Sequence, residues 1–278
     1  MARAGWRAFR HRGAVVGGLL IGLYVTTAAL GGWLAPHSPT RGRLLERLAP
    51  PTRAHLFGVD ELGRDVLSRV MAGARVSLAV QATAVGIALA AGLSLGVLAG
   101  YYGRWADEVI SRAIDLLLAF PGIFLAIAIV ALLGPGLPSV MIAAGVVSIP
   151  QFARLVRGVV LELRRREFVE AALGLGARDR RVVMRHILPN SLPPVIVQTS
   201  LRMATVLLTA SGLGFLGLGV QPPSPEWGAM LANARDYLFE APHVTLAPCL
   251  AITLVVIGFN LLGDGLRDLL DPRLRGSW

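Results

Sequence analysis

The chain has 278 residues, of which 54% are hydrophobic and 16% charged, and its formal net charge is +10 at pH 7. Soluble domains carry charge on about a quarter of their residues, so this composition and the mean hydropathy of +0.63 exclude a soluble nucleic-acid-binding protein. All 27 basic residues are arginine. Without lysine the chain has neither a P-loop lysine nor a Schiff-base lysine, and we expect no catalytic residues in it.

Six apolar blocks predict an all-α integral membrane protein with six transmembrane helices. Most blocks reach the ~20 residues that cross a ~30 Å hydrocarbon core, where each backbone amide must be bonded within its own helix. The first block follows four arginines, as in a signal peptide, but it exceeds the 7–15 apolar residues of a signal core and predicts an uncleaved anchor. The blocks span about 13–35, 76–102, 113–133, 139–161, 192–220 and 243–266.

The second block carries glycines at positions that favour close helix packing. Gly86, Gly92, Gly96 and Gly100 have no side chain to separate two helices in lipid. We therefore expect a packing role for these glycines rather than a hinge.

Arginine placement predicts the orientation, because basic loops are retained on the cytoplasmic side. The segment before the first block has four arginines and no acid, and the loop between the fourth and fifth blocks has nine arginines against four acids. Both termini and this loop are therefore expected in the cytoplasm. Segment 36–75 disagrees, because it is expected outside yet has seven arginines against four acids.

The histidines and the cysteine carry little functional signal. The five histidines are scattered, without a pair at metal-ligand spacing, so the sequence predicts no metal site. The single cysteine, Cys249, allows no internal disulfide.

The loop at about 162–190 begins with a predicted short helix. Glu167 and Glu170 lie early in it, where the helix dipole favours negative charge. Ala171 and Ala172 present only methyl groups, so that another surface can approach closely. The surrounding arginines suit either an acidic partner surface or anionic lipid headgroups, and both alternatives stand at this point.

The second half of the loop predicts a turn and another short helix. Gly174 and Gly176 allow the chain to leave the first helix with positive φ. Asp179 is expected to be the N-cap of the second helix, which Pro189 and Pro193-Pro194 are expected to end. The product is a compact helix–turn–helix that projects from the membrane.

This loop resembles a known family. Glu170-Ala171-Ala172 with Gly176 four residues later resembles the coupling loop of permease subunits of binding-protein-dependent ABC importers. The motifs that resemble the dipeptide/oligopeptide/nickel branch, and its C-type permease, are FGVDELGRDVLSR at 57–69, FARLVRG at 152–158, RHILPN at 185–190, GFLGLGVQPP at 214–223 and NLLGDGLRD at 260–268. Relatives commonly carry a glutamate where this chain reads Thr209-Ala210-Ser211, so no role is carried over for that acid.

The resemblance implies the type I importer permease fold and half of a translocation pathway for di- or oligopeptides. It also implies a second homologous permease, an extracytoplasmic substrate-binding protein and two cytoplasmic ATPases, which would bind ATP and Mg²⁺, so that no cofactor is expected in this chain. We divide the chain into residues 1–74, a permease core at 75–266 and a cytoplasmic tail at 267–278. The residues that would contact an ATPase are Glu167, Glu170, Ala171, Ala172, Gly176, Arg178 and Asp179.

Arg202 is a candidate substrate-pathway residue. An arginine ten residues into an apolar block costs at least ~2.5 kcal/mol unless it meets water or a partner. It could attract a peptide carboxylate, pair with an acid such as Asp115, or extend to the membrane surface.

Alternatives to a peptide importer remain from the sequence. Importers of the same class take nickel chelates or glutathione-like compounds. An ion-driven secondary transporter is a further possibility, although Asp115 is the only acid well inside a block.

Overall fold

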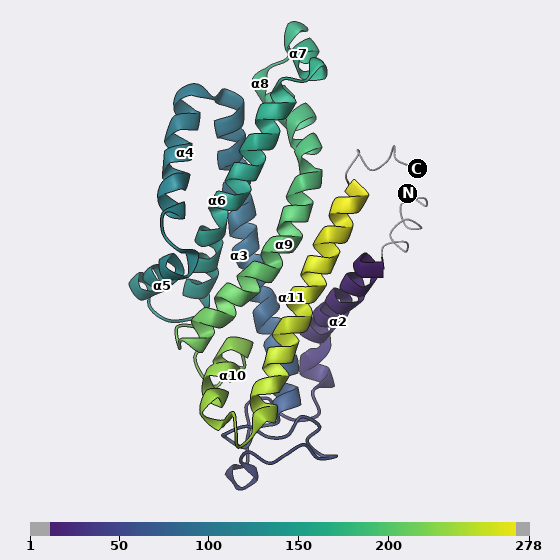
Figure 1. Cartoon of the computed structure of the whole chain (residues 1–278), viewed down its shortest axis with the longest axis vertical. Helices are drawn as coiled ribbons and strands as arrows, with labels where there is room; N and C mark the ends of the chain where they lie inside the picture. Colours follow the sequence, from purple (N-terminus) through teal and green to yellow (C-terminus); the bar gives the residue numbers. More distant parts are fainter. Residues whose placement is uncertain (1–11, 271–278) are drawn as a thin grey trace.

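The computed structural model describes residues 12–270, and the regular secondary structure in this range is helical (Figure 1). Within it, five helices are long and apolar enough to span a membrane, and a bent pair, α4 and α5, forms a sixth candidate span. The three N-terminal arginines before residue 11 and the tail beyond residue 270 lie outside the described residues. The long helices are α2 (Arg12–Leu34), α3 (Val66–Tyr102), α6 (Leu137–Arg164), α9 (Leu188–Phe215) and α11 (Pro242–Leu270).

Helices α3 and α6 pack closely along a row of glycines. A Cβ added at Gly92, Gly96 or Gly100 would lie 2.4–2.8 Å from a Cβ of α6, which is closer than real Cβ atoms approach. Gly86 is different, because a Cβ there would meet nothing within 4 Å. The predicted packing role is therefore confirmed for three of the four glycines.

A buried glutamine links three helices inside the bundle. Gln81 of α3 is fully buried; its Oε1 accepts from the Tyr24 hydroxyl of α2 at 2.6 Å, and its Nε2 donates to the Met203 carbonyl of α9 at 2.8 Å. Because hydrocarbon offers no substitute partner, such bonds fix the relative positions of the helices.

The sequence predicted one transmembrane helix for the third apolar block, but the structure has two helices there with a sharp bend between them. Helix α4 (Arg104–Leu118) ends before Pro121, and α5 (Gly122–Leu133) leaves at 92°. Proline has no N–H to donate and disfavours helical geometry in the residue before it, so the break falls there. Helix α4 lies beside α6 through two ion pairs, Arg157–Asp107 and Arg154–Asp115.

Helix α3 begins ten residues earlier than its apolar block. Its N-cap is Asp65, whose Oδ2 accepts from the Ser68 amide at 2.8 Å and the Ser68 hydroxyl at 2.6 Å. Arg69 and Arg75 hide this start in the sequence, because they interrupt the apolar pattern.

The expected proline stop after the second loop helix is wrong. Helix α8 (Asp179–Val182) continues through a π-helical turn, η2 (Val183–Ile187), into α9, which contains Pro189, Pro193 and Pro194. Pro189 lies in the first turn of α9, whereas Pro193 and Pro194 lie inside the helix. Prolines are tolerated within membrane helices because neighbouring groups and local π-helical turns satisfy the carbonyls that lose a partner.

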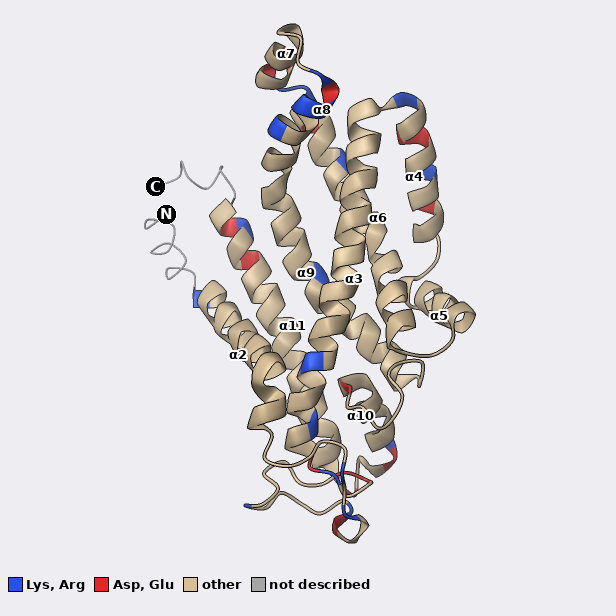
Figure 2. Ribbon diagram, turned by 180° about the vertical axis from the view of Figure 1, so that it is seen from behind, with Lys and Arg blue, Asp and Glu red and all other residues tan. Residues whose placement is uncertain are grey.

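Different secondary-structure elements lie at the two ends of the bundle. Helices α7 (Glu167–Gly174) and α8 extend beyond one end, and segment 35–65 covers the other (Figure 1). Short helices also lie at the second end: η1 (Leu44–Glu46), α10 (Trp227–Ala234) and η3 (Arg235–Tyr237). Figure 2 shows that charged residues gather at these two ends and along α4.

Candidate functional site

Helix α7 presents one face outward and holds the other against its own chain. Glu167, Glu170 and Ala171 are exposed, whereas Val169 is fully buried. Ala172 is half-buried and packs on the apolar cluster around Val169 and Ile187. Of the two alanines, only Ala171 therefore offers its methyl group freely to another surface.

The turn after α7 has the hydrogen bonds of a Schellman motif. Gly176 has φ +80°, its amide donates to the Leu173 carbonyl at 2.9 Å, and the Ala177 amide donates to Ala172 at 3.0 Å. The positive φ expected at Gly176 is confirmed, but Gly174 remains inside α7. A Cβ at Gly176 would meet nothing within 4 Å, so the turn is open to approach.

Asp179 is the first residue of α8 and not its N-cap, which is Arg178. The Oδ1 atom of Asp179 instead accepts a hydrogen bond of 2.8 Å from the hydroxyl of Tyr101, at the end of α3. The Arg164 guanidinium lies over the Tyr101 ring, 5.6 Å from its centroid. Tyr101 thus ties the projecting turn to the bundle; nothing local in the sequence indicates this contact, which joins residues 78 positions apart.

Large apolar side chains near α7 face outward, which the sequence analysis did not anticipate. Leu175 is 90% exposed and Met184 60% exposed, and Phe168 and Leu173 are also exposed. Together with Ala171 they form an apolar surface, which we call the α7 surface. Exposed apolar patches rimmed by polar residues commonly mark protein interaction sites.

The rim of the α7 surface is basic. The turn and α8 carry four exposed arginines, Arg178, Arg180, Arg181 and Arg185, and Figure 2 shows basic residues at this end. With Glu167 and Glu170 on the outer face of α7, the arrangement is suited to a partner that has an apolar groove and acidic edges.

Arg202 lies near the middle of α9, away from the α7 surface. Its Nε is buried and has no hydrogen-bond partner among the described residues. Among the described residues Arg202 forms no ion pair with Asp115, whose carboxylate is bonded by Arg154 at 2.5 Å.

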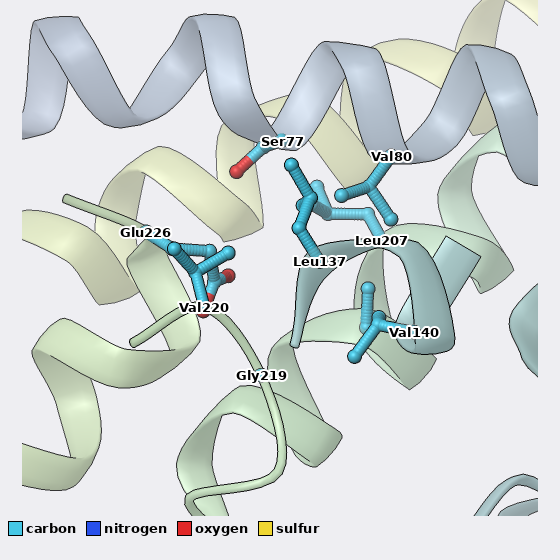
Figure 3. Close-up of a pocket in the computed structure, with 9 residues that line it drawn as sticks. Ser77, Val80, Leu137, Val140, Leu207, Gly219, Val220 and Glu226 are labelled. Atoms are coloured by element: carbon cyan, nitrogen blue, oxygen red, sulfur yellow. The ribbon is translucent and has the colours of Figure 1, made fainter. Parts of the chain in front are cut away.

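A narrow pocket lies between α3, α6, α9 and the start of α10 (Figure 3). Its lining is mainly apolar, with Ser77 and Glu226 as polar exceptions. The Glu226 carboxylate caps α10, because its two oxygens accept from the amides of Gly228 and Ala229 at 2.8 Å each. Burial raises the pKa of Glu226, although these amides act in the opposite direction. Both oxygens of Glu226 therefore have partners within the cap.

The helical bundle and the short helices projecting from it define a multi-pass membrane protein with a surface for an aqueous partner. The chain matches the family of binding-protein-dependent transport system inner membrane components over residues 92–276. Residues 1–51 match the N-terminal TM domain of oligopeptide transport permease C. The chain therefore belongs to the family of binding-protein-dependent transport system inner membrane components.

Similar proteins agree with this assignment. The chain is 48% identical to the dipeptide transport system permease protein DppC of Alkalihalophilus pseudofirmus, over 96% of this chain and 88% of the relative. It is 48% identical to the glutathione transport system permease protein GsiD of Pectobacterium atrosepticum, over 97% of this chain and 90% of that protein. Among solved structures, an inward-facing MetNI methionine ABC transporter matches with a TM-score of 0.58 at 19% identity, over 73% of this chain and 96% of that one. This last likeness concerns the fold alone, which is that of an ABC importer permease.

Proposed function

We propose that this permease subunit forms half of the translocation pathway of an ATP-driven importer of di- or oligopeptides. A second, homologous permease forms the other half, and an extracytoplasmic binding protein delivers the substrate. Two cytoplasmic ATPases bind ATP and Mg²⁺, and this chain contributes no catalytic residue. The observation that carries the proposal is the α7 surface, an apolar patch with a basic rim on helices that project from a membrane bundle.

In this proposal the α7 surface docks in a groove of an ATPase. Glu167, Glu170, Ala171, Gly176 and Arg178 are exposed and form its contacts. Ala172 and Asp179 act from behind, by packing on the cluster around Val169 and by bonding to Tyr101. Movement of the ATPases would then reach α3 and α6 through these attachments. Both chain termini lie on the same, cytoplasmic side.

A bulky charge on the α7 surface tests the docking. We expect Ala171→Arg to abolish co-purification of the ATPases and peptide uptake in proteoliposomes, because the side chain would hold the two surfaces apart. Ala54→Arg is the matched control, since Ala54 is an exposed alanine in segment 35–65, at the opposite end. Retention of the ATPases by Ala171→Arg at wild-type levels would contradict the docking.

The energy source has a separate test. Uptake by the reconstituted complex should stop without the ATPases and survive collapse of the proton gradient. The opposite result would favour the ion-driven carrier. Relatives for dipeptides and for glutathione are equally similar, so competition between labelled dipeptide and glutathione in the same assay assigns the substrate.

We also propose that Arg202 faces the translocation pathway and attracts the carboxylate of a peptide. An arginine this deep in a membrane helix needs water or an anion, and no described residue bonds its Nε. Arg202→Gln should therefore reduce uptake while leaving assembly with the ATPases intact, and Arg202→Lys should retain part of the uptake. Wild-type uptake by Arg202→Gln would end this assignment.

A further inference from the structure

A histidine–carboxylate cluster lies at the end of the bundle opposite the α7 surface. His37 follows α2, His55 lies in segment 35–65, and Asp65 caps α3. The two imidazole rings are 4.6 Å apart, centroid to centroid, and one donor atom from each of the three side chains lies within 4.8 Å of the others. Residues 18 positions apart in the sequence thus meet around one carboxylate oxygen.

The distances are close to those of a tetrahedral metal site. Asp65 Oδ1 is 2.9 Å from His55 Nδ1 and 3.8 Å from His37 Nδ1. A zinc ion with bonds of about 2.0–2.1 Å requires tetrahedral donors about 3.4 Å apart. Each of these two distances differs from this value by about half an ångström or less.

The surrounding groups hold the donors in position. The other oxygen of Asp65 is bound by the amide and hydroxyl of Ser68, so Oδ1, which lies 2.9 Å from His55 Nδ1, is the oxygen that a metal would take. The Ser68 hydroxyl also accepts from the His37 amide at 3.0 Å. On the far side of the His55 ring, Nε2 lies 3.5 Å from Glu46 Oε2. A carboxylate in that place favours the tautomer with the proton on Nε2, in which Nδ1 would present its lone pair to a metal.

We propose that His37, His55 and Asp65 bind a divalent transition-metal ion of the zinc type. Two imidazoles and one carboxylate suit Zn²⁺, Ni²⁺ or Cu²⁺ better than Ca²⁺ or Mg²⁺, which prefer oxygen ligands alone. The His37 side chain is 42% exposed, so the cluster is open to solvent on this side. The ion would fasten segment 35–65 to the first turn of α3. This proposal is independent of the transport function. It differs from the expectation, based on the spacing of the histidines, that the chain has no metal site.

Titration of the full-length protein in lipid nanodiscs tests the site. After treatment with EDTA, ZnCl2 should bind by isothermal titration calorimetry at one ion per chain and raise the thermal midpoint. Co²⁺ in the same site should give the intense visible bands of a tetrahedral complex. Loss of a group that hydrogen-bonds a metal ligand weakens metal binding by about 10–100-fold, so loss of a ligand itself in His55→Ala should weaken Zn²⁺ binding by at least about 100-fold.

Three variants guard against a folding defect and against unspecific binding. His37→Gln removes a ligand whose side chain is 42% exposed, and Glu46→Gln should weaken binding by about 10-fold without removing a ligand. His186→Ala, on the α7 side, should leave Zn²⁺ binding unchanged. Wild-type protein that binds Zn²⁺ no more tightly than His37→Gln would overturn the proposal and leave a hydrogen-bonded cluster only.

Discussion

Arginines crowd both ends of this molecule, but they have opposite surroundings. In segment 35–65 and the first turn of α3, Arg64 and Arg69 are only 4% exposed and share the Asp60 carboxylate at 2.7 and 3.2 Å. At the α7 end the arginines of the turn and α8 are exposed. Buried, paired arginines build a structure within the chain, whereas exposed ones are available to a partner.

This difference also bears on the orientation predicted from the sequence. The excess of arginine in segment 36–75 argued against an outer location, but Arg64, Arg69 and Arg43 are paired with acids and Arg47 donates to the Tyr237 hydroxyl at 2.8 Å. These contacts give the arginines a structural role within the segment. The excess of seven arginines over four acids is unchanged by the pairing, so segment 36–75 still departs from the positive-inside pattern.

Replacing Asp60 should give the largest loss of stability, and it tests most directly whether the arginines at the two ends of the bundle differ. Asp60→Ala leaves two buried guanidinium groups without their shared carboxylate, which costs about 3–5 kcal/mol of unfolding free energy. The matched change at the other end is Glu162→Ala, which removes an exposed partner of Arg166 and should cost less than about 0.5 kcal/mol. If Asp60→Ala and Glu162→Ala lost the same unfolding free energy in denaturation assays, buried pairing at one end would not distinguish it from the other.

The glycine row between the two ends comes next. Gly96→Leu places side-chain atoms where a Cβ alone would lie 2.6 Å from Val156 Cβ, so it should cost about 3 kcal/mol and reduce the yield of folded protein. Gly86→Leu is the control, because its Cβ would meet open space. The thermal midpoints of both variants in nanodiscs measure the loss of stability. A Gly96→Leu protein as stable as Gly86→Leu would contradict the tight α3–α6 packing.

The α3 cap should give a smaller, pH-dependent effect. Loss of the cap in Asp65→Ala should cost about 1–2 kcal/mol, and Asp65→Asn should cost less because asparagine also caps helices. Burial tends to raise the pKa of Asp65, but hydrogen bonds from Ser68 and His55 outweigh it and hold the pKa below the usual 3.8. A carboxyl group with a lowered pKa stabilises the fold above pH 3.8, and this contribution disappears as the pH falls through its folded value. Acid titration of stability should therefore be steeper for wild type than for Asp65→Asn, and identical curves would refute this.

The smallest effect on stability is expected for the hydrogen bond that attaches the turn after α7 to α3. Tyr101→Phe removes one hydrogen bond to Asp179 and should cost about 1 kcal/mol. Because the same bond positions the turn beneath the α7 surface, uptake should fall while ATPase binding remains. Uptake at the wild-type rate would show that the turn is held by packing alone.

The sequence determined most of the membrane-embedded architecture. The apolar blocks located five long helices because hydrocarbon imposes a local rule, about 20 apolar residues per span. It also indicated the exposed α7 helix and the left-handed Gly176, since a helix end is encoded within a few residues. The 92° break before α5 could have been inferred from Pro121, but the apolar composition on both sides concealed it.

Only the tertiary structure decided which side chains meet. The bonds Tyr101–Asp179 and Arg154–Asp115 join residues far apart in the sequence, as does the meeting of His37 with Asp65. Exposure of Leu175 and burial of Arg64 likewise depend on the path of the whole chain. Hydropathy and turn chemistry act over a few residues, whereas ion pairs, burial and ligand geometry depend on distances that exist only after the helices have packed.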